Sequence, residues 1–296
     1  LRDFFTVELE PDDYALFEDT KFATVQDVAD YLDKYLELLR KDTTEGEVED
    51  VALHVRYTRD AELAQARLKL DCGWVLTQVE TARKGKTKLV KVAPKRLGSL
   101  TPSVLPKEQF GIRVFLSATI DPTELSKVLG ISQDKLGVVT VPSTFPVVRR
   151  PLLRDTVGSM NKRSQETTLP LMCTKIDKIL TEYNNVRVLI HGVSGELSEA
   201  IYRGLGPDNA YRLILHTGGD KSSALMEFST PLRPNTVLIS PSMGEGFDGK
   251  DGACRVNIIP KVAYPYLGDK LIKELSEEDI SWYVAQAARS VVQQYG

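Results

Sequence analysis

Small hydroxyl residues, glycines and carboxylates lie close together in the segment VLISPSMGEGFDGKDG, residues 237–252. The apolar run stops at Ser240, and the small or polar residues that follow it include Ser242, Glu245, Gly246 and Asp248. Hydroxyl groups and exposed backbone N–H groups bind phosphate, whereas carboxylates accept hydrogen bonds from ribose hydroxyls and arginines or bind cations. The residue types therefore admit a phosphate loop, a calcium loop, or a turn that is rich in glycine.

The spacing within this segment argues against three well-defined sites. A Walker A loop needs GxxxxGK followed by Ser or Thr, and this full pattern occurs nowhere in the chain. A dinucleotide fingerprint, GxGxxG, is matched by Gly244, Gly246 and Gly249, but KDGACR follows without the apolar period of a helix. An EF-hand loop that began at Asp248 would have aspartates only at positions 1 and 4 and no closing glutamate.

Two further apolar runs end in serine, threonine or histidine. GIRVFLSATI, residues 111–120, predicts a strand that ends near Ser117 and Thr119, and NVRVLIHGVSG, residues 185–195, predicts one that ends near His191 and Ser194. Ligands of parallel α/β sheets bind beyond the carboxyl ends of the strands. These side chains are therefore candidate ligand contacts, although each can equally satisfy the backbone at a strand end, and a buried histidine is more often structural.

The first part of the chain predicts helices and a hairpin. Apolar residues at helical spacing predict a helix over residues 22–40 with Thr24 as its N-cap, whereas residues 51–70 are ambiguous. WVLTQVE and TKLVKVA, residues 74–80 and 87–93, predict a hairpin with a basic turn. That turn is solvated or binds nucleic acid through its lysines, Lys84, Lys86 and Lys88.

The rest of the chain alternates between helical and strand patterns. Asp121 is the expected N-cap of a helix that starts at Pro122, and residues 141–151 read as an extended linker in which Phe145 packs or stacks on a base. Helices are then expected over residues 167–183, 196–206, 221–230 and 276–296, and strands over residues 185–195, 210–218, 235–242 and 255–262. This alternation predicts an α/β fold, a parallel sheet flanked by helices, after a mainly helical N-terminal region.

Bulk composition limits the class of protein. The 296 residues are 42% hydrophobic and 27% charged, and the net charge of −3 excludes a uniformly basic nucleic-acid coat but not a local basic groove. No apolar run approaches the ~18 residues of a membrane span, and no signal peptide is visible. Cys72, Cys173 and Cys254 form no CxxC pair, so we expect free thiols, no metal site and a reducing cytoplasmic compartment.

Four segments together resemble the XPD/DinG branch of superfamily 2 DNA helicases. VFLSATI is similar to motif III and VLIHGVSG to the motif IV region. VLISPSMGEGFDGKDGACRVNIIPKVAYPYLGD is similar to the long and specific motif V segment. WYVAQAARSVVQQYG resembles the approach to motif VI, Q-x-x-G-R-x-x-R, with Gln293 and Gly296 in the Q and G places. The resemblance covers residues 111–296 well and residues 1–110 more weakly.

The resemblance implies two RecA-like domains that bind ATP and Mg²⁺ between them, hold single-stranded DNA, and act as a 5′-to-3′ helicase. It implies an arch-like helical region over residues 1–72, the end of the first RecA-like domain over 73–148, and the second over 149–296. It implies catalytic or ATP-binding roles for Gly246, Asp248, Gln293 and Gly296. It implies DNA contacts by Ser117, Thr119, His191, Ser194, Ser240, Ser242, Glu245 and Arg255, with Lys261 as a further cation that can reach DNA.

The sequence departs from the family pattern in its ATP-binding half. It has no Walker A, no DEAH-type Walker B, and none of the arginines of motif VI that neutralise transition-state charge. The cysteines that hold an iron–sulfur cluster in many family members are also missing. We therefore expect the isolated chain to be inactive and to be part of a cytoplasmic helicase, nucleoid-associated if bacterial and nuclear if eukaryotic. The alternative is a non-catalytic module, derived from a helicase domain, that binds nucleic acid or a partner.

Overall fold

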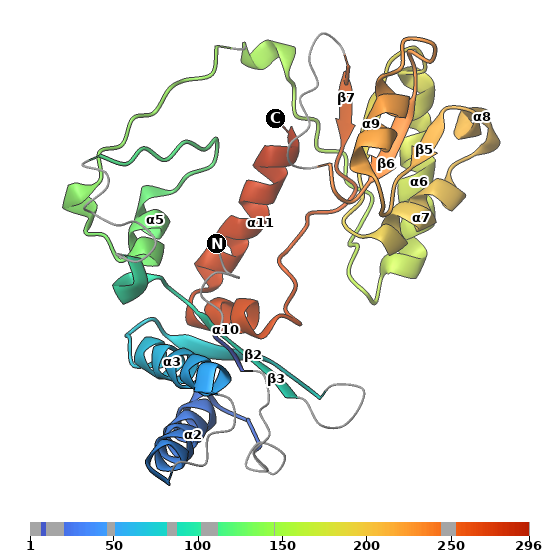
Figure 1. The fold of residues 1–296 in the computed structure, drawn as a ribbon. Helices are drawn as coiled ribbons and strands as arrows, with labels where there is room; N and C mark the ends of the chain where they lie inside the picture. Colours follow the sequence, from blue (N-terminus) through green and yellow to red (C-terminus); the bar gives the residue numbers. More distant parts are fainter. Residues whose placement is uncertain are drawn as a thin grey trace. The chain divides into compact units, whose positions relative to one another are not determined.

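The chain forms two compact units in the computed structural model, which describes residues 7–9, 21–45, 51–81, 88–101, 112–144, 146–243 and 253–295. The first unit contains Leu1–Thr140 and Tyr266–Ile280, and the second contains Val141–Pro265 and Ser281–Gly296. Figure 1 follows the chain through both. The chain therefore passes between the two units three times, and a segment from near its C-terminus belongs to the first unit.

The first unit is built on an antiparallel sheet with the strand order β1-β3-β2. These strands are β1 (Val7–Leu9), β2 (Trp74–Thr81) and β3 (Lys88–Pro94). Helices α2 (Val25–Glu45) and α3 (Val51–Leu68) cover one face, where Leu32, Leu36 and Leu39 pack with Leu76, Val90 and Val92. The predicted hairpin is thus confirmed, and the ambiguous residues 51–70 are largely helical.

Helix α2 starts where the sequence predicts. The Thr24 hydroxyl accepts the Asp27 N–H at 3.2 Å, and the Asp27 carboxylate accepts the Thr24 N–H at 2.7 Å. Backbone hydrogen bonds from Ala23 and Thr24 lower the pKa of Asp27. This reciprocal arrangement is a capping box, which satisfies N–H groups that the first helical turn leaves without partners.

Helix α10 (Lys270–Glu278) covers the other face of the same sheet. Its Leu271 is buried with Val75 and Ala93, which alternate along β2 and β3 with the residues that face α2. The Lys95 ammonium lies 2.8 Å from the Glu274 carboxylate and 2.5 Å from that of Glu278. Burial opposes the charge of Lys95, but its hydrogen bonds to both glutamates outweigh this effect and raise the pKa of Lys95. The C-terminal segment is therefore held by apolar packing and an ion-pair cluster.

Replacement of Lys95 by alanine is expected to lower the free energy of unfolding of the first unit by about 1–2 kcal/mol, because two ion pairs to half-exposed carboxylates are lost. The measurement is urea unfolding followed by Trp74 fluorescence in a Trp282→Phe background, since the chain has two tryptophans. Lys41→Ala, which removes an exposed pair with Glu45 within α2, is the matched control and is expected to change this free energy by less than 0.5 kcal/mol. Equal effects of the two variants would show that the cluster contributes nothing.

The strand predicted over residues 111–120 is not formed. Ile112, Val114 and Leu116 are 86%, 76% and 90% exposed, and residues 112–117 have no strand assignment. An apolar run of this kind is stable as a strand only when neighbours pair with both edges and helices cover both faces. The described residues of the first unit supply neither. The following helix is as predicted: α5 (Pro122–Leu129) is capped by the Asp121 carboxylate, which accepts the Thr123 N–H at 2.9 Å.

The second unit contains a four-stranded parallel sheet with the order β5-β6-β4-β7. The strands are β4 (Val188–His191), β5 (Leu213–Leu215), β6 (Val237–Ser240) and β7 (Val256–Ile258). Helices α6 (Gln165–Glu182) and α7 (Gly195–Gly204) cover one face, and α9 (Lys221–Ser229) covers the other (Figure 1). The predicted α/β architecture of this part, a parallel sheet flanked by helices, is confirmed.

Alternate residues of the central strands fill the two cores. Val188, Ile190, Val237 and Ile239 pack with α6 and α7, whereas Leu189 and Leu238 pack with Phe228 of α9. Both faces of β4 and β6 are therefore buried, which explains why the sequence shows continuous apolar runs there.

The remaining elements are short or C-terminal. They are η2 (Gly98–Leu100), η3 (Gln133–Lys135), η4 (Val147–Arg149), α8 (Pro207–Ala210) and α11 (Ile280–Tyr295). One helix was predicted over residues 276–296, but Asp279 adopts an extended conformation and separates α10 from α11. The prediction was wrong there because α10 packs on the hairpin through Leu271 and Leu275, whereas α11 begins as a separate helix after Asp279. Among the described residues, none of the helices combines the length and apolarity that crossing a membrane requires.

Candidate nucleic-acid interface

The carboxyl ends of three strands meet at one edge of the second unit's sheet. His191 of β4 is in register with Ser240 of β6, and the Gly192 N–H donates to the Ser240 carbonyl at 2.9 Å. The chain beyond β5 continues the ladder, because the His216 N–H donates to the Ile239 carbonyl at 2.9 Å. The topology thus brings together side chains that are distant in the sequence.

Ser240 is the centre of this arrangement and is completely buried. Its hydroxyl lies 3.0 Å from His216 Nδ1 and accepts the Ser242 N–H at 3.2 Å. The hydroxyls of Ser240 and Ser242 form a longer contact of 3.4 Å. Ser242 is exposed and can therefore reach a ligand, whereas Ser240, which was predicted to contact phosphate, can act only through its neighbours.

His191 is nearly as buried, with 3% of its surface exposed. Within the described part of the chain, neither ring nitrogen has a hydrogen-bond partner. Burial lowers the pKa of His191 to about 4, and the nearby Asn257 side chain, which does not reach hydrogen-bonding geometry, offsets this only in part. The imidazole is therefore neutral at neutral pH, and it does not contribute a positive charge to this edge of the sheet.

The N-terminus of α7 lies beyond the same strand ends. The Ser194 hydroxyl accepts the Leu197 N–H at 3.2 Å, so this residue is the N-cap of the helix. A side chain at Gly192 would place its Cβ 3.0 Å from the Cβ of Ser198, so glycine permits the close approach of β4 and α7. A helix N-terminus presents backbone N–H groups and a partial positive charge, both of which suit an anion.

Arg255 and Lys261, which follow Cys254, lie at opposite ends of strand β7. Arg255 precedes β7, and its N–H donates to the carbonyl of Arg187, which precedes β4, at 3.2 Å. Because β4 and β7 are parallel, Arg255 lies at the amino edge of the sheet, away from Ser242. The structure therefore does not bring the predicted DNA contact Arg255 to the candidate site. Lys261 follows the carboxyl end of β7 and is half-exposed.

Other predicted site residues lie elsewhere. Ser117 and Thr119 belong to the first unit, where the Ser117 hydroxyl accepts the Thr119 N–H at 3.2 Å in a turn before α5. Gln293 is exposed near the end of α11. Lys88 is the first residue of β3. The rest lie outside the described residues: Lys84, Lys86, Phe145, Glu245, Gly246, Asp248 and Gly296.

His216 is a candidate that the sequence reasoning missed. It follows the apolar run LIL as His191 follows VLI, and this repetition of an apolar strand with a terminal histidine was the available signal. Its importance arises from the strand order, because β6 lies between β5 and β4 and places Ser240 between the two histidines.

Comparison with known proteins finds no match for this chain, either among family models or among curated proteins.

The described ranges hold no group of three His, Cys, Asp or Glu side chains that could bind a metal ion. Cys72, Cys173 and Cys254 are free thiols. Burial raises the pKa of Cys254 to about 11, and it raises the pKa of the other two thiols as well. Thiolates are the reactive and metal-binding form, so these cysteines are poor nucleophiles and ligands.

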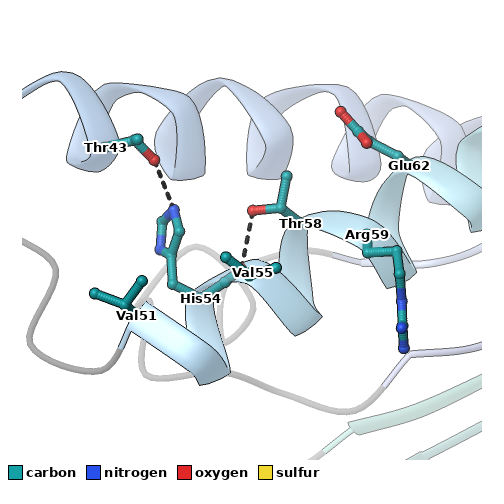
Figure 2. Close-up of a pocket in the computed structure, with 7 residues that line it drawn as sticks. All are labelled: Thr43, Val51, His54, Val55, Thr58, Arg59 and Glu62. Atoms are coloured by element: carbon teal, nitrogen blue, oxygen red, sulfur yellow. Dashed lines mark hydrogen bonds between the residues drawn. The ribbon is translucent and has the colours of Figure 1, made fainter.

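A hollow of about 600 Å³ lies between α2 and α3 in the first unit (Figure 2). His54 points toward α2, and its Nε2 shares a hydrogen bond of 2.8 Å with the Thr43 hydroxyl. Val51 and Val55 supply apolar walls, whereas Arg59 points away from α2. The His54 imidazole therefore links α3 to α2 through this hydrogen bond.

Proposed function

We propose that the chain is the C-terminal part of an ATP-dependent 5′-to-3′ DNA helicase of the XPD/DinG type. In this proposal residues 149–296 form the second RecA-like domain, which holds single-stranded DNA at the carboxyl edge of its sheet. The observation that supports it best is the junction of three parallel strand ends, where the exposed Ser242 adjoins buried Ser240 and the Ser194-capped α7 begins beside them. Motif resemblance over residues 111–296 adds the direction and type of activity.

The chemistry of this edge suits the DNA backbone. The Ser242 hydroxyl, the N-terminal amides of α7 and the Lys261 ammonium all favour phosphate oxygens, and none of them distinguishes one base from another. Contacts of this kind hold a strand without reading its sequence, which a translocating motor requires.

ATP chemistry depends on residues that are not in this sequence. A Walker A loop would bind the phosphates, a Walker B carboxylate would hold Mg²⁺, and the motif VI arginines would stabilise the transition state. The exposed apolar run from Ile112 to Leu116 agrees with this division, because it has the composition of a buried strand but has no sheet neighbours among the described residues. We propose that Asp248 links the ATP site to the DNA-binding edge, and that any iron–sulfur cluster belongs to the missing half.

Lys261→Ala is expected to weaken binding of oligo-dT by about fivefold at 0.1 M salt and to reduce the salt slope, d log K/d log[salt], by about 0.7 in magnitude, the value for one lost phosphate contact. The measurement is fluorescence anisotropy of a labelled oligonucleotide with the 296-residue chain, titrated at several salt concentrations. Because Lys261 contacts backbone only, its loss should act alike on mixed-sequence DNA.

Arg255→Ala is the matched control, since it removes the same charge from the opposite edge of the same sheet. It is expected to leave the salt slope unchanged. Absence of binding by the unaltered chain, or equal losses in both variants, would contradict a DNA-binding edge at these strand ends.

A further inference from the structure

At the end of β6, a chain of hydrogen bonds connects the exposed Ser242 to buried Ser240 and to His216. An exposed serine can bind a phosphate without a histidine behind it, so the presence of His216 needs an explanation. His216 is 8% exposed, Ser240 is fully buried, and Ser242 is exposed, so the chain runs from the core to the surface. In the described structure the Nε2 atom of His216 is buried and has no partner. A buried polar group without a partner destabilises the fold, so a histidine at this position is expected to have a function that offsets the cost.

We propose that His216 is a positioning residue that sets the direction of the Ser240 and Ser242 hydroxyls, so that Ser242 donates a hydrogen bond to a phosphate of single-stranded DNA. The inference rests on the proposed function and names the residue that prepares its phosphate contact. His216 does not touch the DNA in this scheme, because two serines separate it from the surface.

The geometry fixes one hydrogen bond of the Ser240 hydroxyl, which is the bond that its oxygen accepts. The Ser242 N–H donates to the Ser240 oxygen at 3.2 Å, which uses part of the acceptor capacity of that oxygen. A hydroxyl has one hydrogen to donate. The Ser240 hydrogen therefore goes either to His216 Nδ1, at 3.0 Å, or to the Ser242 hydroxyl, at 3.4 Å.

The tautomer of the neutral His216 ring decides between these two directions. If Nδ1 carries no hydrogen, Ser240 donates to it, and Ser242 can turn its own hydrogen inward to Ser240. If Nδ1 carries the hydrogen, it donates to Ser240, Ser240 donates to Ser242, and the Ser242 hydrogen is left for an external acceptor. Only the second arrangement forms a continuous donor chain that ends at an anion, and such chains strengthen each member.

Desolvation favours the same arrangement. With the hydrogen on Nδ1, the buried Nε2 of His216 is an unpaired acceptor, and with the other tautomer it is an unpaired N–H. Folded proteins leave buried backbone N–H groups unpaired more rarely than backbone carbonyls. By extension to the imidazole, we take the Nδ1–H tautomer as the resting state, which phosphate binding consolidates.

The first test compares His216→Asn with His216→Leu. The asparagine amide can replace Nδ1 as a donor to Ser240, whereas leucine fills similar space without a polar atom. Binding of oligo-dT is expected to fall about fivefold in His216→Leu and to be largely restored in His216→Asn. In a Ser242→Ala background, His216→Leu should have no further effect, because coupled residues are non-additive and here share one contact.

The second test needs no variant. Long-range ¹H–¹⁵N correlation spectra of the imidazole are expected to show His216 as the Nδ1–H tautomer when oligo-dT is bound. An Nε2–H tautomer in the complex overturns the inference, as does unchanged affinity in His216→Leu or an undiminished effect of that variant in Ser242→Ala. If the unaltered chain binds no oligo-dT, the proposed function fails and this inference with it, whereas binding that His216→Leu leaves unchanged removes the inference alone.

Discussion

Replacement of Arg212 by methionine is expected to lower the free energy of unfolding of the second unit by about 3–5 kcal/mol. Arg212 is 1% exposed and donates to four backbone carbonyls: Asn235 at 2.6 Å, Leu180 at 3.0 Å, Tyr183 at 3.2 Å and Val186 at 2.7 Å. Methionine fills similar volume but removes a donor from all four carbonyls, of which that of Leu180 accepts a fully buried bond and the other three accept partly buried ones.

The physical reason is the position of these carbonyls. Leu180 and Tyr183 lie in the last turn of α6 and at its C-cap, where carbonyl groups have no partner within the helix and the helix dipole is negative. Burial lowers the pKa of Arg212, yet an arginine remains charged, so the guanidinium compensates its desolvation by these charge-assisted bonds. Lysine cannot reproduce the planar set of donors, so Arg212→Lys should recover little of the loss.

Trp282 fluorescence in a Trp74→Phe background reports unfolding of the second unit, to which Trp282 belongs. The control is Arg203→Met, which removes an exposed arginine whose ion pair with Glu199 lies within α7. It is expected to change the free energy of unfolding by less than 0.5 kcal/mol. A loss below about 1 kcal/mol in Arg212→Met would mean that water satisfies these carbonyls and that the guanidinium is dispensable.

Acidification is expected to destabilise the second unit through His191. Its pKa is about 4 in the folded chain, below the 6.5 of an ordinary histidine, because burial disfavours the charged ring. The unfolded chain therefore binds the proton first, and stability is lost as the pH falls from about 6.5 toward 4. The loss is about 2 kcal/mol at pH 5 and about 3 kcal/mol at pH 4, from 1.36 kcal/mol per pKa unit.

His191→Asn removes the titrating ring. The unfolding free energy of this variant should therefore fall less on acidification than that of the unaltered chain, by about 2 kcal/mol at pH 5. Urea unfolding at pH 7, 6, 5 and 4.5, followed by Trp282 fluorescence, gives the comparison. His54→Asn, in the first unit, serves as the control and should leave the pH dependence of the second unit unchanged. Parallel pH profiles for His191→Asn and the unaltered chain would show that carboxylates, not this imidazole, govern the acid response.

Several elements were predictable from local sequence because local forces create them. Thr24 and Asp121 cap α2 and α5 through side-chain contacts within four residues, and Ser194 does so for α7. The hairpin and the helices α2, α6, α7 and α9 follow from apolar periodicity. The strand expected over residues 111–120 is not formed. An apolar run indicates that a segment tends to be buried, but it forms a strand only where neighbouring strands pair with it.

Local sequence was sufficient to locate most helices and the four parallel strands of the second unit, and to place polar residues such as His191 and Ser242 at or just beyond the strand ends. Tertiary structure alone decided which of these residues meet. The order β5-β6-β4-β7 places His216 beside Ser240, and the parallel direction of β4 and β7 leaves Arg255 at the opposite edge of the sheet. Helix α10 binds the hairpin through contacts such as that of Glu278 with Lys95, which lies 183 residues earlier. Strand order and helix docking depend on contacts between segments that are distant in the sequence. Periodicity, capping and motif spacing are local features, so they contain no information about those contacts.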